Sequence, residues 1–149
     1  TIHLATAHDG LALRPLFEPV FARIQKGAFG RQLEGADLEA LTASGRRFFA
    51  RGAGTLAEFR GALGDEWSAY PSPALGYSVS YRVPLVQVPP RGLWTTSGQA
   101  RWTTTEAWLG QSMQDDYPLD RLVLRYLAAF GPATAMDVQA WCGLTKRER

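Results

Sequence analysis

The first half of the chain carries apolar residues at helical spacing in four successive stretches. Over residues 10–26, apolar positions recur every three or four residues, which predicts an amphipathic helix that Pro19 should kink or split. Shorter stripes of the same kind predict helices over 38–51, 56–63 and 73–82. Glu58 stands three residues after Thr55, at the third position of the third predicted helix, and this is the spacing of a capping box. The residues expected to cap the four helices are Asp9, Asp37, Thr55 and Ser72.

The pattern changes after residue 84. Two short apolar runs, 85–88 and 100–103, flank a loop that contains Gly, Arg and Trp, and this arrangement predicts a β-hairpin over about 85–104. Three helices followed by a basic hairpin is the order of a winged helix, a fold used mostly to hold double-stranded DNA. We therefore expect the hairpin to be the wing.

Helical patterns return in the last third of the chain, over 119–130 and 135–141, and repeat the earlier order of helix, turn and short helix. The predicted fold class is α+β and mostly helical, with tandem winged helix-turn-helix units, one complete and two partial. Residues 1–34 are expected to hold the end of a first unit plus a connecting helix, 35–112 a complete winged-helix domain, and 113–149 the start of a further unit. Since both ends fall inside expected elements, we expect a piece of a longer protein.

Composition allows a packed core and a local basic surface. Hydrophobic residues make up 46% of the 149 residues, and the net charge is only +2, which argues against a histone-like polyelectrolyte. Lys26 and Lys146 are the only lysines among 16 basic residues. Arginine suits bidentate contacts to phosphate and guanine, although a GC-rich coding genome would give the same bias.

Several classes of site find no support in the sequence. Cys142 is the only cysteine, so no internal disulfide can form, and a reducing cytoplasm is the expected compartment. No apolar run approaches the roughly 20 residues that a membrane-spanning helix needs. Neither a Cys/His metal-ligand spacing nor a phosphate-binding glycine motif is present, so no metal and no cofactor are expected.

Three passages carry a family resemblance: Thr-Ile-His-Leu-Ala-Thr-Ala at 1–7, Pro-Leu-Val-Gln-Val-Pro-Pro-Arg-Gly-Leu-Trp at 84–94, and Arg-Tyr-Leu-Ala-Ala-Phe-Gly-Pro-Ala-Thr at 125–134. Together they resemble the bacterial winged-helix proteins that include the AlkZ-like DNA glycosylases for alkylated bases and interstrand crosslinks. The resemblance implies three tandem winged helices arranged around DNA. It also implies a catalytic Gln-x-Gln or Gln-x-Asp motif in the N-terminal part. We expect no such motif in this sequence and therefore no catalytic residue here, and activity of the longer protein stays open.

The helix over 73–82 occupies the recognition position of the complete unit. With Leu75 and Val79 facing inward, hydroxyl and guanidinium groups on the outward face are candidates for DNA contacts. The alternative is that the tyrosines of this helix pack against a neighbouring unit. The outward candidates are Tyr77, Ser78, Tyr81 and Arg82.

The wing and the two ends of the chain supply the remaining candidates. On the wing these are Arg91, Trp94 and Arg101; Arg91 can reach a phosphate or the minor groove, whereas Trp94 and Trp102 are expected rather to cover the sheet. At the C-terminal end, Lys146 and Arg147 begin a basic helix or form a solvated tail. His3 is a candidate cleft residue, with burial in a core as the alternative.

These observations predict duplex DNA binding, as a winged-helix portion of a glycosylase-like DNA-repair protein that acts on alkylated or crosslinked bases. The expected partners are double-stranded DNA and other winged-helix units of the same chain, with no membrane and no metal. Two alternatives stay open: a non-enzymatic winged-helix transcription regulator, and a winged helix that binds protein. Salt dependence separates them, because only phosphate binding weakens steeply with salt.

Overall fold

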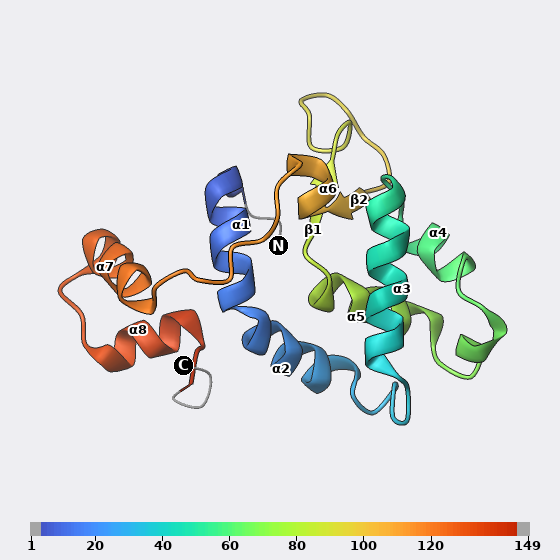
Figure 1. Cartoon of the computed structure of the whole chain (residues 1–149), viewed down its shortest axis with the longest axis horizontal. Coiled ribbons are helices and arrows are strands. Elements are labelled where there is room, and N and C mark those ends of the chain that lie inside the picture. The colour runs from blue at the N-terminus through green and yellow to red at the C-terminus, as the bar shows by residue number, and fades with distance from the viewer. Residues whose placement is uncertain (1–3, 146–149) are drawn as a thin grey trace. The chain divides into compact units, whose positions relative to one another are not determined.

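The computed structural model describes residues 4–145. Within these residues it contains eight α-helices, one short 3-10 helix and a two-stranded antiparallel sheet (Figure 1). The prediction of a mostly helical α+β fold is therefore confirmed. The chain divides into two compact units. Unit 1 combines the segment up to Val20 with the segment from Met113 onward, and unit 2 spans Phe21–Ser112.

Two helices of unit 2 begin at side-chain caps that the sequence predicts. The Asp37 carboxylate accepts hydrogen bonds from the backbone N–H groups of Glu39 and Ala40 at 3.0 and 2.9 Å. Thr55 and Glu58 form the predicted capping box. The helical elements are α2 (Glu18–Phe29), α3 (Leu38–Arg51), α4 (Leu56–Gly61), the 3-10 helix η1 (Asp65–Trp67), α5 (Ser72–Arg82) and α6 (Thr105–Leu109).

The core of unit 2 is built around α3, α4 and α5. Helix α5 turns Leu75 and Val79 inward, as predicted, and both side chains are buried. Helices α3 and α5 approach closely at Gly45, because a Cβ atom at that position would overlap Cγ1 of Val79. The buried side chains of the core are Leu33, Leu41, Phe49, Phe59, Trp67, Ala74, Leu75, Val79 and Val83.

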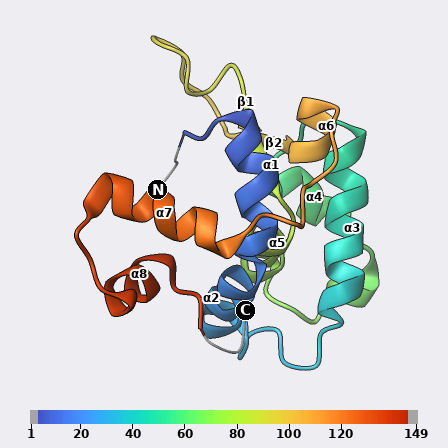
Figure 2. The same cartoon turned by 60° about the vertical axis from the view of Figure 1, so that its left-hand side comes forward.

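The predicted hairpin is present. Strand β1 (Leu85–Val88) pairs antiparallel with β2 (Arg101–Thr104), which begins one residue later than expected. Gly54, between α3 and α4, joins the sheet through an isolated bridge to Trp102, with reciprocal backbone hydrogen bonds of 2.9 and 2.7 Å. The connection 89–100 extends away from the paired strands in both Figure 1 and Figure 2. The base of this loop is therefore fixed to the helices.

Three helix starts differ from the predictions. The first helix is capped by Thr6, whose Oγ1 accepts from the N–H of Asp9 at 3.1 Å, so Asp9 lies inside the helix. The expected single helix over 10–26 is split at Phe17, so that Pro19 falls in the first turn of α2, where its missing N–H costs no hydrogen bond. Ser72 is the first residue of α5 and not its cap, which is Pro71.

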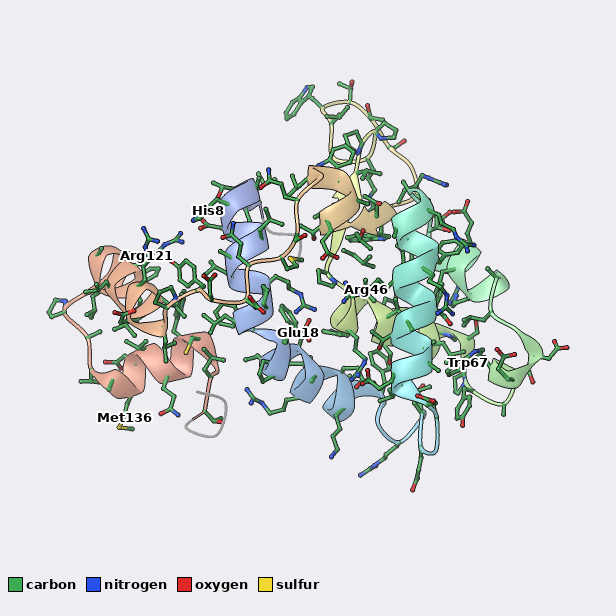
Figure 3. The ribbon with its side chains drawn as sticks, viewed as in Figure 1. His8, Glu18, Arg46, Trp67, Arg121 and Met136 are labelled. Atoms are coloured by element: carbon green, nitrogen blue, oxygen red, sulfur yellow. The ribbon has the colours of Figure 1, made fainter. Side chains whose placement is uncertain are left out.

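Unit 1 contains α1 (Ala7–Leu16), α7 (Leu119–Phe130) and α8 (Ala135–Cys142). Thr134 and Asp137 form a capping box at the start of α8, and Gly143 ends the helix in the left-handed conformation at φ 71°. A bidentate ion pair joins Arg125 of α7 to Asp9 of α1, with N–O distances of 2.6 and 2.9 Å. In Figure 3, His8 marks the N-terminal part of α1 and Met136 projects from α8. The buried hydrophobic side chains of unit 1 are Leu11, Ala12, Leu122, Val138 and Leu144.

None of the helices between residues 4 and 145 combines the length and the apolar character needed to cross a membrane.

Candidate nucleic-acid interface

A groove of about 310 Å³ runs along unit 2 between α4, α5 and the loop of the hairpin. Two residues predicted from the sequence, Tyr77 of α5 and Arg91 of the loop, line it together. The full lining is Thr55, Leu56, Ala57, Arg60, Pro73, Gly76, Tyr77, Arg91, Gln99, Ala100 and Trp102. Three separate segments of the unit thus meet at one surface hollow.

The two tyrosines of α5 rest on an aromatic residue of α2. The ring of Tyr77 stacks on Phe29, with centroids 6.1 Å apart and an interplanar angle of 4°, and Tyr77 remains 52% exposed. Tyr81 is half-buried, and its ring centroid lies 6.3 Å from that of Phe29. Since Phe29 belongs to unit 2, both tyrosines pack within their own unit. Tyr77 nevertheless faces outward, as predicted.

Ser78 does not face outward, so that prediction is wrong. The side chain is fully buried, and its Oγ accepts a hydrogen bond from Nε2 of the equally buried Gln25 at 3.0 Å. The reason is helical geometry, because Ser78 stands three positions after Leu75 and therefore lies on the same inward face. This spacing was visible in the sequence.

Two of the predicted arginines are engaged in contacts within the protein. Nε of Arg82 donates to Oγ1 of Thr42 at 2.7 Å, and its Nη2 pairs with Glu39. Arg101 donates through Nη1 to Oε1 of Glu58 at 3.0 Å and through Nη2 to the carbonyl of Ala53 at 2.6 Å. Arg82 thus ties α5 to α3, and Arg101 ties β2 to the start of α4.

The Glu58 carboxylate is stabilised in its charged form. The backbone N–H of Thr55 donates to Glu58 Oε2 at 2.8 Å, and the Arg101 guanidinium adds a second contact. These contacts hold the pKa of Glu58 below its ordinary value of 4.5, with the Thr55 hydrogen bond as the largest cause. Arg101 is therefore matched by a carboxylate that stays charged.

The loop of the hairpin carries the remaining predicted residues. Arg91 is exposed, and its backbone carbonyl accepts from Nε2 of Gln87 at 3.1 Å, which fixes the start of the loop to β1. Trp94 is 93% exposed, so the expectation that it covers the sheet is wrong. Trp102 does cover it, since this side chain packs on the core of unit 2. The difference follows from position, because Trp102 lies within β2 and Trp94 lies in the extended loop.

Arg60 is a groove residue that the sequence interpretation missed. Its side chain crosses Gly76 of α5, where an added Cβ atom would lie 3.1 Å from Cδ of Arg60. Nε of Arg60 is buried and has no hydrogen-bond partner in the part of the chain that the structure describes. The signal available in the sequence was a basic residue next to the inward apolar stripe of the short helix predicted over 56–63.

The comparison with known families decides the assignment. A family model described as DNA glycosylase AlkZ-like matches residues 1–149. The chain belongs to the AlkZ-like DNA glycosylase family. This membership connects the chain with DNA repair and with DNA as its partner. The chain matches no curated protein and no solved structure.

Three predicted residues of this AlkZ-like chain, His3, Lys146 and Arg147, lie outside the described residues. Their assignments stay predictions. Among residues 4–145, no group of three or more His, Cys, Asp or Glu side chains is arranged to hold a metal ion.

The expectation that no Gln-x-Asp motif occurs in this AlkZ-like chain is wrong, because the string Gln114-Asp115-Asp116 has that spacing. It lies in the connection that leads to α7 and not in the N-terminal part, and all three residues are exposed. The backbone N–H of Gln114 donates to the carbonyl of Leu11 at 3.1 Å. Since this position differs from the one that the family resemblance implies, we assign these side chains no catalytic role.

Proposed function

We propose that this chain binds duplex DNA, as a winged-helix portion of an AlkZ-like repair protein that acts on alkylated or crosslinked bases. In this proposal unit 2 forms most of the complete winged-helix domain predicted over 35–112. Helices α3, α4 and α5 are its three helices, and β1 and β2 form the wing. Helix α5 is the recognition helix. Residues 113–149, with α7 and α8, then begin a further unit, and residues 1–34 end a preceding one.

The order of elements in unit 2 supports this proposal. A winged helix places its wing directly after the recognition helix, and here β1 begins three residues after the end of α5. The backbone at Gly54, in the connection between α3 and α4, pairs with Trp102 and so adds a third segment to the edge of the sheet. This bridge holds the wing against the helices, so the loop 89–100 starts from a fixed base.

The groove is the observation that carries the proposal. It lies between the proposed recognition helix and the wing, and it is lined by Arg60, Arg91 and Tyr77 but by no carboxylate. Guanidinium and hydroxyl groups are the donors that proteins direct at phosphates and base edges. The exposed Trp94 lies three positions beyond Arg91 on the same loop. The guanidinium groups suit the phosphates of a nucleic acid, and the exposed indole suits its bases.

A titration of the chain with a fluorescently labelled duplex tests the proposal. Anisotropy measured at several salt concentrations should show binding whose affinity falls with a log–log slope of about 0.9 per phosphate contact. The same titration with excess unlabelled duplex as competitor controls for binding to the dye. Absence of binding at low salt contradicts the proposal.

A protein-binding winged helix is the second candidate, and one surface feature favours it. Trp108 is 54% exposed and lines an apolar hollow of about 300 Å³ with Val88, Pro89 and Ala107. Association through this face would bury apolar surface and change little with salt. The salt series therefore separates the two candidates.

A further inference from the structure

We infer that Arg60 and Arg91 form a subsite for a backbone phosphodiester within the groove of unit 2. The inference rests on the proposed DNA binding and makes it specific. It names one ligand group, the phosphate, and assigns its contact to two arginines from different segments. Arg60 comes from α4, before the recognition helix, and Arg91 comes from the loop after β1.

The first support is the unsatisfied donor on Arg60. Its Nε–H is shielded from solvent and meets no acceptor among residues 4–145. A buried donor without an acceptor is costly, and such groups in native proteins call for an explanation such as a bound ion or ligand. Nε is also one of the donors that a guanidinium uses for bidentate contacts with phosphate. A phosphate oxygen is therefore an acceptor that would satisfy this group.

The second support is the lack of a competing acid. Other arginines of unit 2, namely Arg46, Arg82 and Arg101, pair with the carboxylates of Glu106, Glu39 and Glu58. No such pair involves Arg60 or Arg91 in the described part of the chain, and no Asp or Glu lines the groove. Two positive charges thus face a hollow without a negative one, which favours an anionic ligand.

The third support is the kind of polar group in the groove. Arg60 and Arg91 can only donate hydrogen bonds, whereas Tyr77 and Gln99 can both donate and accept them. A phosphodiester offers only acceptors, which suits the two guanidinium groups, whereas a base edge also presents donors that these two groups cannot accept. We therefore assign the subsite to the sugar-phosphate backbone, where its contribution is independent of base sequence.

Gly76 gives the subsite its shape. The stem of Arg60 lies across α5 at this glycine, with Cδ and Cγ at 3.1 and 3.4 Å from the place a Cβ atom would take. An alanine there would crowd the stem and move the guanidinium without changing the charge of the protein. Gly76→Ala therefore tests the position of Arg60 separately from its charge.

A second hollow of unit 2 supplies the matched control. It is lined by Arg47 together with Asp37, Glu66 and Trp67, the last of which is labelled in Figure 3. Its mixed charge does not favour a phosphate. Arg47→Gln removes the same charge as Arg60→Gln, but from this other hollow.

The experiment titrates the 149-residue chain and its variants with two labelled duplexes of unrelated sequence over a salt series. Arg60→Gln and Arg91→Gln should each weaken binding by about fivefold to tenfold for both duplexes and lower the salt slope by about 0.9. Gly76→Ala should weaken binding with an unchanged or raised Tm, since alanine favours the helix. Arg47→Gln should leave affinity within about twofold.

If a variant fails to fold, an NMR spectrum of the arginine Nε–H groups of the wild-type chain tests the phosphate subsite instead. In the wild-type chain labelled with ¹⁵N, the Arg60 signal should shift when duplex is added. Salt-dependent binding by the wild type, with the Arg60 signal and the Arg60→Gln slope both unchanged, overturns the subsite and leaves DNA binding standing. Absence of any wild-type binding overturns the proposed function itself.

Discussion

At the scale of single residues, Ser78 shows that the face of a helix decides the role of a polar side chain. Its hydroxyl is buried against Gln25 of α2 and links that helix to α5. The pair satisfies two polar groups that would otherwise be buried without partners. Ser78 therefore belongs to the interior of unit 2.

Ser78→Ala should lower the free energy of unfolding by about 1–3 kcal/mol, because the amide of Gln25 would stay buried without this acceptor. Chemical denaturation monitored by circular dichroism measures the loss. The double variant Gln25→Leu with Ser78→Ala serves as the control, and it should recover part of the loss because neither polar group remains. A single variant as stable as the wild type would show that the hydrogen bond is not needed.

The contacts of the arginines could not be predicted from the sequence. The presence of arginines on α5 and on the hairpin could be seen in the sequence, but the acids that pair with them lie far away along the chain. Glu39 lies 43 positions before Arg82, and Glu58 lies 43 positions before Arg101. Only the fold brings these pairs together. Arg60 was missed for the same reason, because the groove that it lines is assembled from three segments.

At the scale of elements, the contact between α3 and α5 depends on the absence of a side chain at Gly45. Gly45→Ala should destabilise unit 2 by about 1–3 kcal/mol, because the added methyl overlaps Val79 and pushes the helices apart. Gly27→Ala is the matched control, since nothing lies within 4 Å of its added Cβ in α2. That control should gain about 1 kcal/mol from helix propensity. Thermal melts of both variants measure the difference, and equal shifts would contradict the close packing.

The capping box of α4 predicts a pH dependence. The folded-state pKa of Glu58 is lowered, so its contribution to stability is complete above its ordinary value of 4.5 and is lost as the pH falls through the folded-state value. Thermal melts of the wild type and of Glu58→Gln, at about pH 7 and about pH 3.5, test this. The wild type should be more stable at neutral pH, and the two proteins should converge in acid. A constant difference at both pH values would be contrary to this prediction.

Elements with strong local signals were predictable from the sequence. Helix α3 has the bounds expected from its Asp37 cap and its apolar stripe, and α8 begins at residue 135, as the apolar pattern over 135–141 predicts. Helix α6 was not predicted, because five residues directly after a strand are too few for a periodic pattern. Pro19 was expected to kink or split the helix over 10–26, and the helix is split, but the break lies two residues earlier, at Phe17.

At the scale of the whole molecule, unit 1 is held together by contacts between distant parts of the chain. The Asp9–Arg125 pair joins positions 116 residues apart. Hydrogen bonding to Arg125 is the largest cause of the lowered pKa of Asp9, so the carboxylate is charged at neutral pH. A pattern read along the sequence groups neighbouring residues and cannot show such a pairing.

Asp9→Asn should loosen unit 1 and leave unit 2 unaffected. The variant removes one charge of an exposed pair, so the expected effect is small and should diminish at high salt. Hydrogen exchange measured segment by segment would show faster exchange in α1 and α7 and unchanged exchange in α5. Glu34→Gln, an exposed acid of unit 2, controls for the change in net charge. Equal acceleration in all helices would show that the two units unfold together.

The exposure of Trp94 has a practical consequence for optical experiments. A tryptophan in water emits at longer wavelengths than one in a protein interior, and it is open to collisional quenchers such as acrylamide. Trp94 is almost fully exposed, whereas Trp67 is buried, so the two indoles report on different surroundings. The difference between the spectra of the wild type and Trp94→Phe would isolate the emission of the loop. The hairpin thus carries its own spectroscopic probe, and any macromolecule seated on it would shield that emission from quenching.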